Sequence, residues 1–207
     1  MGHPDMRRRA MLETPVAILP AGYQAVDHIN MKKNCYMDLG SISYSDPGFY
    51  VDFDISERYN AYGPHVISTS NNYILFNPRS SSHTRAALKG TEGTSGGHVY
   101  LNYRAVATLN INSDGVFTVS YADQTETFTI TAGSAASGNV YLCAYASSIT
   151  DTKYHLHGNI YSIKLYDGGV LMKDLVPCIR TADSKAGLYD VVNDVYYGNI
   201  GSGTIGV

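Results

Sequence analysis

The sequence has no tryptophan and few charged residues, since Asp, Glu, Lys and Arg make up 16% of its 207 positions. No apolar run approaches the roughly 18 residues that a membrane-spanning helix needs. The net charge of −3 also lacks the basic excess with which nucleic-acid-binding proteins contact phosphates. We therefore expect neither a membrane anchor nor a nucleic-acid partner.

Several motifs of catalysis and ligand binding are absent as well. The glycine-rich run 90–97 (GTEGTSGG) contains the spacing G-x-S-x-G at 93–97, but no strand-helix unit surrounds it as a nucleophile elbow requires. The run fits neither G-x-G-x-x-G nor a P-loop. We interpret that run as a flexible loop. No segment has the spacing of a calcium-binding loop, although loop Asp and Asn oxygens are suitable calcium ligands. We predict no cofactor, and calcium stays open as an alternative without a specific motif.

The three cysteines, Cys35, Cys143 and Cys178, cannot all pair within one chain. Cys143 lies inside the alternating segment 140–146 (VYLCAYA), which favours burial. We predict buried, reduced thiols, with a single disulfide as the alternative.

What the sequence does contain is tyrosine, 18 in all, and many short segments that alternate apolar and polar residues. Residues 49–56 and 116–121 are clear examples, and turn residues separate such segments at intervals of about 8–12 positions. No helical periodicity extends beyond a turn or two. The pattern predicts an all-β fold, a two-sheet antiparallel sandwich. Eight side chains are expected in its core: Phe53, Ile55, Phe117, Val119, Phe128, Leu142, Ile163 and Leu165.

The stretch 157–198 is the most regular part of the chain and predicts four strands in two hairpins. In its first strand, 159–166, three apolar positions alternate with polar ones. Because alternate residues of a strand point to opposite faces, Tyr161, Ile163 and Leu165 are expected to share one face.

Turn residues then divide this stretch. Asp167-Gly168-Gly169 tolerates the positive φ angles of a tight hairpin turn. Pro177 is expected to end the return strand, because proline cannot donate to a sheet ladder. Residues 187–189 and 195–197 are expected to pair as the second hairpin.

The same stretch carries a resemblance to a known family. Residues 161–178 (YSIKLYDGGVLMKDLVPC) and 187–204 (GLYDVVNDVYYGNIGSGT) resemble the end of LamG-like domains (laminin G/concanavalin A-like), which are common in gut bacteria and their bacteriophages. Residues 22–40 match the start of these domains more weakly. The resemblance covers about residues 22–207 and implies a concanavalin A-like lectin-glucanase jelly roll there. It does not imply one function, because the fold hosts lectins, adhesion modules, glycosidases and capsid parts.

Residues 1–21 differ from the rest and are interpreted as an extended, basic N-terminal anchoring arm. Glu13 and Pro15 interrupt its apolar part, so we expect no signal peptide. Its small apolar surface cannot offset the entropy lost on ordering, so we expect the arm to lie along another chain. The predicted partner-anchoring residues are Arg7, Arg8, Arg9, Met11 and Leu12.

Asp52, Asp54 and Glu57 form no complete catalytic motif but are similar to the acidic strand of laminarinase-type glycosidases. Such enzymes need a nucleophile and a general acid about 5–5.5 Å apart. The first position here is Asp, one methylene shorter than that family's nucleophile, and tryptophan for stacking on sugars is absent. We therefore predict that Asp52 and Asp54 share one face, point to solvent or to a neighbour, and catalyse no hydrolysis.

Two further groups of residues are candidates for binding. His155 and His157 would share one strand face and could form half of a metal site; a hydrogen-bonded or solvated pair is the simpler interpretation. One region combines the aromatic and amide side chains that sugar binding uses. Its residues are Tyr59, Tyr62, Asn71, Asn72, Tyr73 and Asn77.

These observations give two hypotheses. The first is a non-enzymatic structural or adhesion protein of a bacteriophage virion, such as a capsid decoration, head fibre or tail component, assembled in the host cytoplasm. Its partners would be other virion proteins, such as the major capsid protein or neighbouring copies in a homo-oligomer, together with host or mucosal glycans. The alternative is a bacterial carbohydrate-binding, lectin-like module or a laminarinase-type glycosidase.

Overall fold

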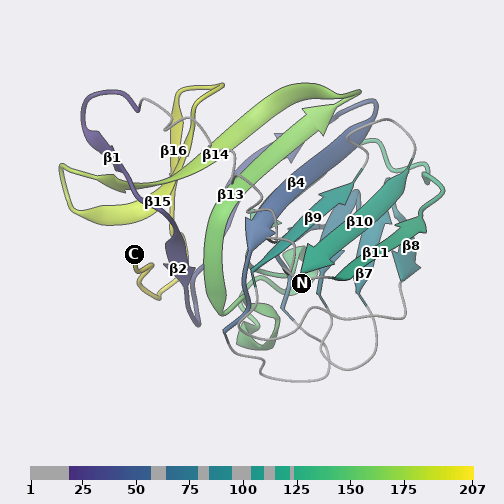
Figure 1. The fold of residues 1–207 in the computed structure, drawn as a ribbon, viewed down its shortest axis with the longest axis horizontal. Helices are drawn as coiled ribbons and strands as arrows, with labels where there is room; N and C mark the ends of the chain where they lie inside the picture. The colour runs from purple at the N-terminus through teal and green to yellow at the C-terminus, as the bar shows by residue number, and fades with distance from the viewer. Residues whose placement is uncertain (1–18, 57–63, 79–83, 95–103, 110–114, 122–123) are drawn as a thin grey trace, which may run out of the picture.

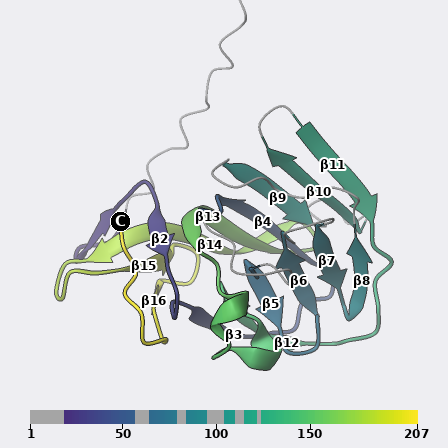
Figure 2. The same ribbon diagram turned by 90° about the horizontal axis from the view of Figure 1, so that it is seen from below.

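The computed structural model describes residues 19–56, 64–78, 84–94, 104–109, 115–121 and 124–207. These residues form two antiparallel β-sheets that stack face to face (Figures 1 and 2). The helical elements of the described residues are two 3-10 turns, and no helix among them is long and apolar enough to cross a membrane. The predicted all-β antiparallel sandwich is therefore confirmed.

The two sheets are called sheet A and sheet B. The strands of sheet A are β1 (Tyr23–Ala25), β2 (Ile29–Met31), β4 (Pro47–Phe53), β9 (Ala105–Leu109), β10 (Val116–Tyr121), β11 (Gln124–Thr129), β13 (Gly158–Asp167), β14 (Val170–Arg180), β15 (Lys185–Asp190) and β16 (Val195–Gly198). The strands of sheet B are β3 (Met37–Ile42), β5 (Ile67–Thr69), β6 (Ile74–Asn77), β7 (Arg85–Leu88), β8 (Thr91–Thr94) and β12 (Gly138–Leu142). The 3-10 turns η1 (Ala146–Ser148) and η2 (Thr152–Tyr154) connect β12 to β13.

Sheet A follows the order β11-β10-β9-β4-β13-β14-β15-β16, with β1 beside β14 and β2 beside β13. Sheet B follows β3-β12-β5-β6-β7-β8. Figure 2 shows the layers edge on, with β4, β9 and β10 above β5, β6 and β7, and with β15 and β16 at one side of the sandwich.

The core lies between the sheets because alternate residues of each strand point inward. In β4, Phe49 and Phe53 point inward and are fully buried. Tyr50, which follows Phe49, points outward and is half-buried. The ring of Phe76 in β6 joins the layers, with its centroid 5.9 Å from that of Phe49 and 5.2 Å from that of Phe53. Seven of the eight predicted core side chains are buried, and Phe128 is half-buried against the same cluster.

β13 departs from strict alternation at one point. Its register against β4 shifts between Ile160 and Ser162, which makes Tyr161 part of a β-bulge. Ile160 and Ile163 therefore both point into the core, and the half-buried Tyr161 points outward. The prediction that Tyr161 shares a face with Ile163 and Leu165 is wrong, because the extra residue of the bulge reverses its direction.

β14 continues through Pro177 to Arg180, which corrects the prediction that Pro177 ends the strand. The Pro177 carbonyl accepts a hydrogen bond from Val26 N at 3.0 Å. Because the N–H and C=O of one strand residue point to the same neighbour, the missing N–H faces the β1 side. The ladder to β15, where Pro177 lies opposite Leu188, is left intact.

The first part of the glycine-rich run 90–97 is a hairpin rather than a flexible loop. Thr91–Thr94 forms β8 and pairs with β7, while residues 95–97 lie outside the described residues. Lys89 (φ +48°) and Gly90 (φ +90°) form the two-residue connection. Positive φ at both positions is the geometry that matches the twist of a tight hairpin.

All three cysteines are free and buried, which confirms the prediction of reduced thiols. Burial raises the pKa of the Cys178 thiol to about 11. Burial also raises the pKa values of the Cys35 and Cys143 thiols. Because the thiolate is the reactive form, we expect these side chains to be inert in the folded protein.

The second predicted hairpin is confirmed as β15 and β16, and residues 187–198 are called the β15–β16 hairpin. Asp190 organises its loop and is fully buried. Its carboxylate accepts backbone N–H bonds from Asp174 at 3.2 Å and Val192 at 3.1 Å. It also accepts from Asn193 Nδ2 at 2.8 Å and Lys173 Nζ at 3.4 Å. The acceptor capacity of this buried charge is thus used within the fold.

Glycine is required where this hairpin crosses the tyrosine rings. A Cβ on Gly187, which lies opposite Gly198, would be 2.6 Å from the hydroxyl oxygen of Tyr196. The Tyr196 ring instead packs beside Tyr23, with centroids 5.6 Å apart, and Tyr23 packs on Tyr189 at 4.5 Å. The motif that carries the family resemblance therefore specifies turns and packing.

Candidate functional site

The outer face of sheet A is the face turned toward the viewer in Figure 1. Over β10 and β11 it carries hydroxyls that bond across the strands, Thr118 to Thr127 at 3.2 Å and Ser120 to Thr125 at 3.0 Å. Over β4, β13 and β14 the character changes to aromatic and charged.

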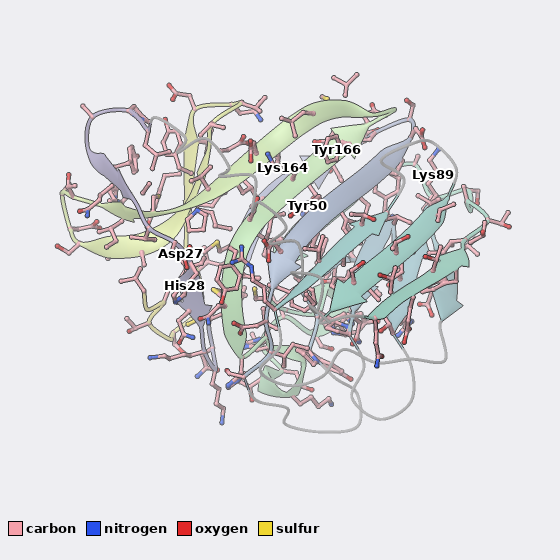
Figure 3. The ribbon with its side chains drawn as sticks, in the orientation of Figure 1. Asp27, His28, Tyr50, Lys89, Lys164 and Tyr166 are labelled. Carbon is pink, nitrogen blue, oxygen red and sulfur yellow. The ribbon has the colours of Figure 1, made fainter. Side chains whose placement is uncertain are left out.

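Four side chains of this region form a group that we call the tyrosine platform: Tyr50, Lys164, Tyr166 and Asp174. Lys164 of β13 lies opposite Tyr50 of β4 on one side and Asp174 of β14 on the other. Lys164 Nζ contacts Asp174 Oδ2 at 2.9 Å. Tyr166 lies opposite Gly48, which has no side chain to cover the ring. Figure 3 shows Tyr50, Lys164 and Tyr166 side by side on this face.

Both tyrosine hydroxyls of the platform stay protonated at neutral pH. Partial burial raises the pKa of Tyr50, and the nearby Asp52 carboxylate raises it further. Partial burial likewise raises the pKa of Tyr166, with a contribution from Asp174. A neutral phenol can both donate and accept a hydrogen bond, so each ring offers an apolar surface and a two-way polar tip.

Next to the platform lies a bonded group that we call the Arg104 network: Asp52, Asp54, Arg104, Asn159 and Tyr161. Arg104 donates to Asp52 through Nε and Nη2, both at 2.7 Å. Its guanidinium lies 3.9 Å from the centroid of the Tyr161 ring. Asp54 accepts from Asn159 N, from Asn159 Nδ2 and from the Tyr161 hydroxyl, each at 2.9 Å. The network fixes Tyr161 in the bulge of β13.

The pKa shifts agree with this arrangement. The hydrogen bonds to Asp52 raise the pKa of Arg104, which keeps the guanidinium charged. Burial raises the pKa of Tyr161, and its hydrogen bond to Asp54 raises it further. Charge-assisted and bidentate hydrogen bonds are among the strongest in proteins, so we expect the network to hold its geometry.

The two acids predicted to share a face do so, but both are engaged. Asp52 is 7% exposed and Arg104 binds it. Of the two predicted positions, facing solvent or facing a neighbour, exposure to solvent is therefore wrong for Asp52. Both oxygens of Asp52 and both of Asp54 accept hydrogen bonds from protein groups. Glu57, the third acid of the similarity to glycosidases, lies outside the described residues.

The structure separates the six residues predicted to bind sugars. Tyr59 and Tyr62 lie outside the described residues. Tyr73 and Asn77 are 0% and 1% exposed. The Tyr73 hydroxyl donates to the Tyr44 carbonyl, and Asn77 Nδ2 lies 3.2 Å from His65 Nε2. Because both side chains are buried, Tyr73 and Asn77 cannot contact a glycan in solution directly.

Asn71 and Asn72 lie at the surface in the turn between β5 and β6, and their amides are used there. Asn71 donates to the Ser137 carbonyl and accepts from Tyr73 N at 3.1 Å. Asn72 has a φ of +55° and donates to Glu92 at 2.5 Å. Asparagine tolerates this left-handed conformation, which explains its presence in the turn.

His155 is held by the fold through both ring nitrogens. Nδ1 accepts from Asn34 N at 3.1 Å, and Nε2 lies 2.8 Å from the Ile149 carbonyl, to which it donates as the protonated nitrogen. Burial lowers the pKa of His155, which favours this neutral form. The interpretation of a hydrogen-bonded histidine is confirmed for His155. Within the described residues no cluster of three or more His, Cys, Asp or Glu side chains could hold a metal ion.

A shallow pocket of about 470 Å³ opens at the end of the sandwich between Ser43–Ser45, Lys89 and residues 133–136. The Lys89 ammonium donates to the Ser45 carbonyl, and Ser43 Oγ donates to Ala136 O at 3.1 Å. Polar groups that line this pocket thus bind one another. The five predicted anchoring residues of the arm, Arg7 to Arg9, Met11 and Leu12, lie outside the described residues.

Sequence comparisons leave the family open: no protein-family model matches the chain, and no curated protein matches it. Solved structures do match. A putative carbohydrate-binding protein from Bacteroides ovatus aligns with a TM-score of 0.53 and 11% identity over 88% of this chain and 60% of that protein. The chain is therefore similar in fold to that protein and spans less than two thirds of its length.

Two further structures align less well. A heptameric SAP-like pentraxin from Limulus polyphemus has a TM-score of 0.43 and 9% identity, over 67% of this chain and 74% of the pentraxin. The extracellular region of zebrafish Gpr126/Adgrg6 has a TM-score of 0.40 and 14% identity, over 70% of this chain and 22% of that one. TM-scores below 0.5 are too low for either similarity to support a conclusion about this protein. None of the three is a phage protein, and none supports the LamG-like family in particular.

Proposed function

We propose that this protein is a non-enzymatic carbohydrate-binding module that holds a glycan on the outer face of sheet A. The observation that carries the proposal is the tyrosine platform, in which two half-buried rings with protonated hydroxyls flank Lys164. Sugars present C–H groups that pack on aromatic rings and hydroxyls that exchange hydrogen bonds. The similarity in fold to a putative carbohydrate-binding protein supports the proposal.

The platform is suited to binding because it lies on paired strands and not on loops. Tyr50, Lys164 and Asp174 occupy three adjacent strands in one register. A site on regular elements is held more rigidly than one on loops, so less entropy is lost when a ligand binds. The hydroxyls over β10 and β11 extend the polar face beyond the platform.

Binding fits the Arg104 network better than hydrolysis does. A glycosidase needs one carboxylate free to attack or to activate water and another that delivers a proton. Here Asp52 is held by Arg104, and Asp54 is held by Asn159 and Tyr161. The network then acts as a support for the adjacent platform.

The test is affinity electrophoresis through gels that contain one polysaccharide each. Wild-type protein should be retarded by at least one of them, and Tyr50→Ala and Tyr166→Ala should each weaken binding about tenfold, the effect of losing roughly 1.4 kcal/mol. Tyr141→Ala is the matched control, since Tyr141 is a half-buried tyrosine on β12 of the other sheet. Retardation by no polysaccharide, or equal loss in Tyr141→Ala, would refute the proposal.

The virion hypothesis remains a prediction and is not favoured by any of the comparisons. It depends on residues 1–21 binding a neighbouring virion protein, and residues 1–18 lie outside the described residues. Protein that begins at Gly22 should keep its melting temperature and its glycan binding but fail to join an assembly. Unfolding of that truncated protein would instead show that the arm belongs to the sandwich.

A further inference from the structure

The charges on the binding face are already matched to one another. The tyrosine platform and the Arg104 network together contain two cations, Lys164 and Arg104. Arg104 is paired with Asp52 at 2.7 Å, and Lys164 is paired with Asp174 at 2.9 Å. Asp54 adds a third carboxylate on the same face. The face therefore offers carboxylates in excess of cations.

The rim of the face adds negative charge. Asp27 lies in the link between β1 and β2 with its side chain 80% exposed. Its charge contributes to the raised pKa of Arg104, which places it within electrostatic reach of the network. Figure 3 shows Asp27 and His28 at the edge of the same face as Tyr50 and Lys164. His28 Nδ1 lies 3.2 Å from Asp27 Oδ2.

An acidic glycan would compete with these pairs. Asp52 already takes the Nε and Nη2 donors of Arg104. A carboxylate or sulfate group must therefore either displace Asp52, which is 7% exposed, or bind the remaining N–H groups of Arg104 beside that carboxylate. Leaving Asp52 without its partner costs free energy that water offsets only in part. The same ligand would meet like charges at Asp54 and Asp27.

A neutral glycan meets none of these costs. Carboxylates that already bind a guanidinium or an ammonium retain lone pairs that accept hydrogen bonds from sugar hydroxyls. The hydroxyls of Tyr50 and Tyr166 supply both donors and acceptors. Binding of this kind leaves the ion pairs in place.

We infer that the tyrosine platform and the adjacent Arg104 network select neutral polysaccharides and reject acidic ones, because Asp52 and Asp174 already pair with Arg104 and Lys164. This inference rests on the proposed function and narrows it to a ligand class. It also states how binding depends on ionic strength. A neutral ligand forms no ion pair with the protein, so salt that screens exposed charges should leave its affinity unchanged.

The experiment compares neutral gels (β-glucan, xylan, galactomannan) with acidic gels (alginate, polygalacturonate, heparin) at low and at high NaCl. Wild-type protein should be retarded by a neutral gel equally at both salt concentrations and should pass the acidic gels freely. Asp174→Asn keeps the shape of the side chain and frees Lys164. We expect this variant to gain affinity for acidic polysaccharides by about fivefold at low salt.

Asp183→Asn is the matched control, because it removes the same charge from a pair with Arg180 outside the platform. It should leave every affinity unchanged. Thermal melts check that both variants are folded. An equal gain in Asp183→Asn, or no gain in Asp174→Asn, would overturn the assignment of selectivity to the platform's ion pairs.

The wild-type result distinguishes the preference for neutral glycans from glycan binding itself. Retardation by an acidic gel that disappears at high salt and in Tyr50→Ala would overturn the selectivity while leaving the binding function in place. Retardation by no gel would overturn both.

Discussion

The tyrosine platform and the β15–β16 hairpin are both rich in tyrosine and aspartate, but they use these residues differently. In the hairpin, Asp190 is fully buried and accepts hydrogen bonds from four residues of the fold. In the platform, Tyr50 and Tyr166 are only partly buried, and no ring contact joins either to another described residue. The same residue types thus stabilise the fold in one place and remain available to a ligand in the other.

A conspicuous sequence motif therefore need not mark a binding site. The sequence of the hairpin is recognisable because turn geometry, a ring over Gly187 and a buried carboxylate restrict many neighbouring positions at once. The platform has no compact motif, since its members come from three separate strands. Changes in the hairpin should therefore affect stability, and changes in the platform should affect binding.

The largest effect is expected for Asp190→Ala in the hairpin. Removing the carboxylate leaves Lys173 and several N–H donors without their buried acceptor, and we expect the free energy of unfolding to fall by about 3–5 kcal/mol. Urea denaturation measures this loss. Asp183→Ala, which removes an exposed ion pair, should change stability by less than about 1 kcal/mol. A comparable loss in both variants would show that Asp190 has no special role in the fold.

A smaller effect, on both stability and glycan affinity, is expected for Arg104→Gln. Asp52 loses its bidentate partner, but the Arg104 side chain is 53% exposed, so water can replace part of the interaction. We expect a loss of stability of about 1 kcal/mol and a loss of glycan affinity smaller than that of Tyr50→Ala. Arg104→Lys should restore little, because lysine cannot reproduce the two parallel hydrogen bonds. Full rescue by lysine would show that only the charge matters.

Asn71→Ala tests a residue that the sequence analysis predicted as a candidate for sugar binding. The structure uses its amide to tie the turn between β5 and β6 to Ser137 and to Tyr73 N. We expect stability to fall by about 1 kcal/mol in chemical denaturation and glycan affinity to stay unchanged. Weaker binding at unchanged stability would restore the sequence-based prediction for this residue.

The smallest effect is expected when glycan affinity is measured as a function of pH. The raised pKa values of Tyr50 and Tyr166 keep both hydroxyls protonated above the ordinary tyrosine value of about 10. Glycan affinity should therefore be flat from about pH 6 to 9 and should fall only as the phenols ionise at higher pH. Electrophoresis at several pH values measures this. A decline centred below pH 10 would mean that another group controls binding.

Much of the fold follows from alternation and turn residues. β10 (Val116–Tyr121) lies at the residues predicted for it, and β13 and β14 are joined at the predicted turn. What could not be predicted depends on pairing between distant segments. The bulge that turns Tyr161 outward is visible only in its register against β4, and the burial of Asn77 depends on its packing beside His65.

The arrangement of the outer face of sheet A could not be predicted from the sequence for the same reason. Asp52 and Asp54 were correctly placed on one face of a strand, but their partners Arg104 and Asn159 come from other strands or connections. Tyr50 and Tyr166 were not singled out, because nothing in the chain indicates that Lys164 and Gly48 lie beside them. One local signal is present in the sequence: alternation in 49–56 and 159–166 places Tyr50 and Lys164 on the polar side of their strands.

The most direct test of the account is chemical-shift mapping by NMR with a hexasaccharide cut from whichever neutral polysaccharide retards the protein most. The account predicts perturbed amide signals around Tyr50, Lys164, Tyr166 and Asp174, and unchanged signals through the β15–β16 hairpin from Gly187 to Gly198. Perturbations confined to that hairpin, or to the pocket beside Lys89, would contradict the assignment of glycan binding to the outer face of sheet A.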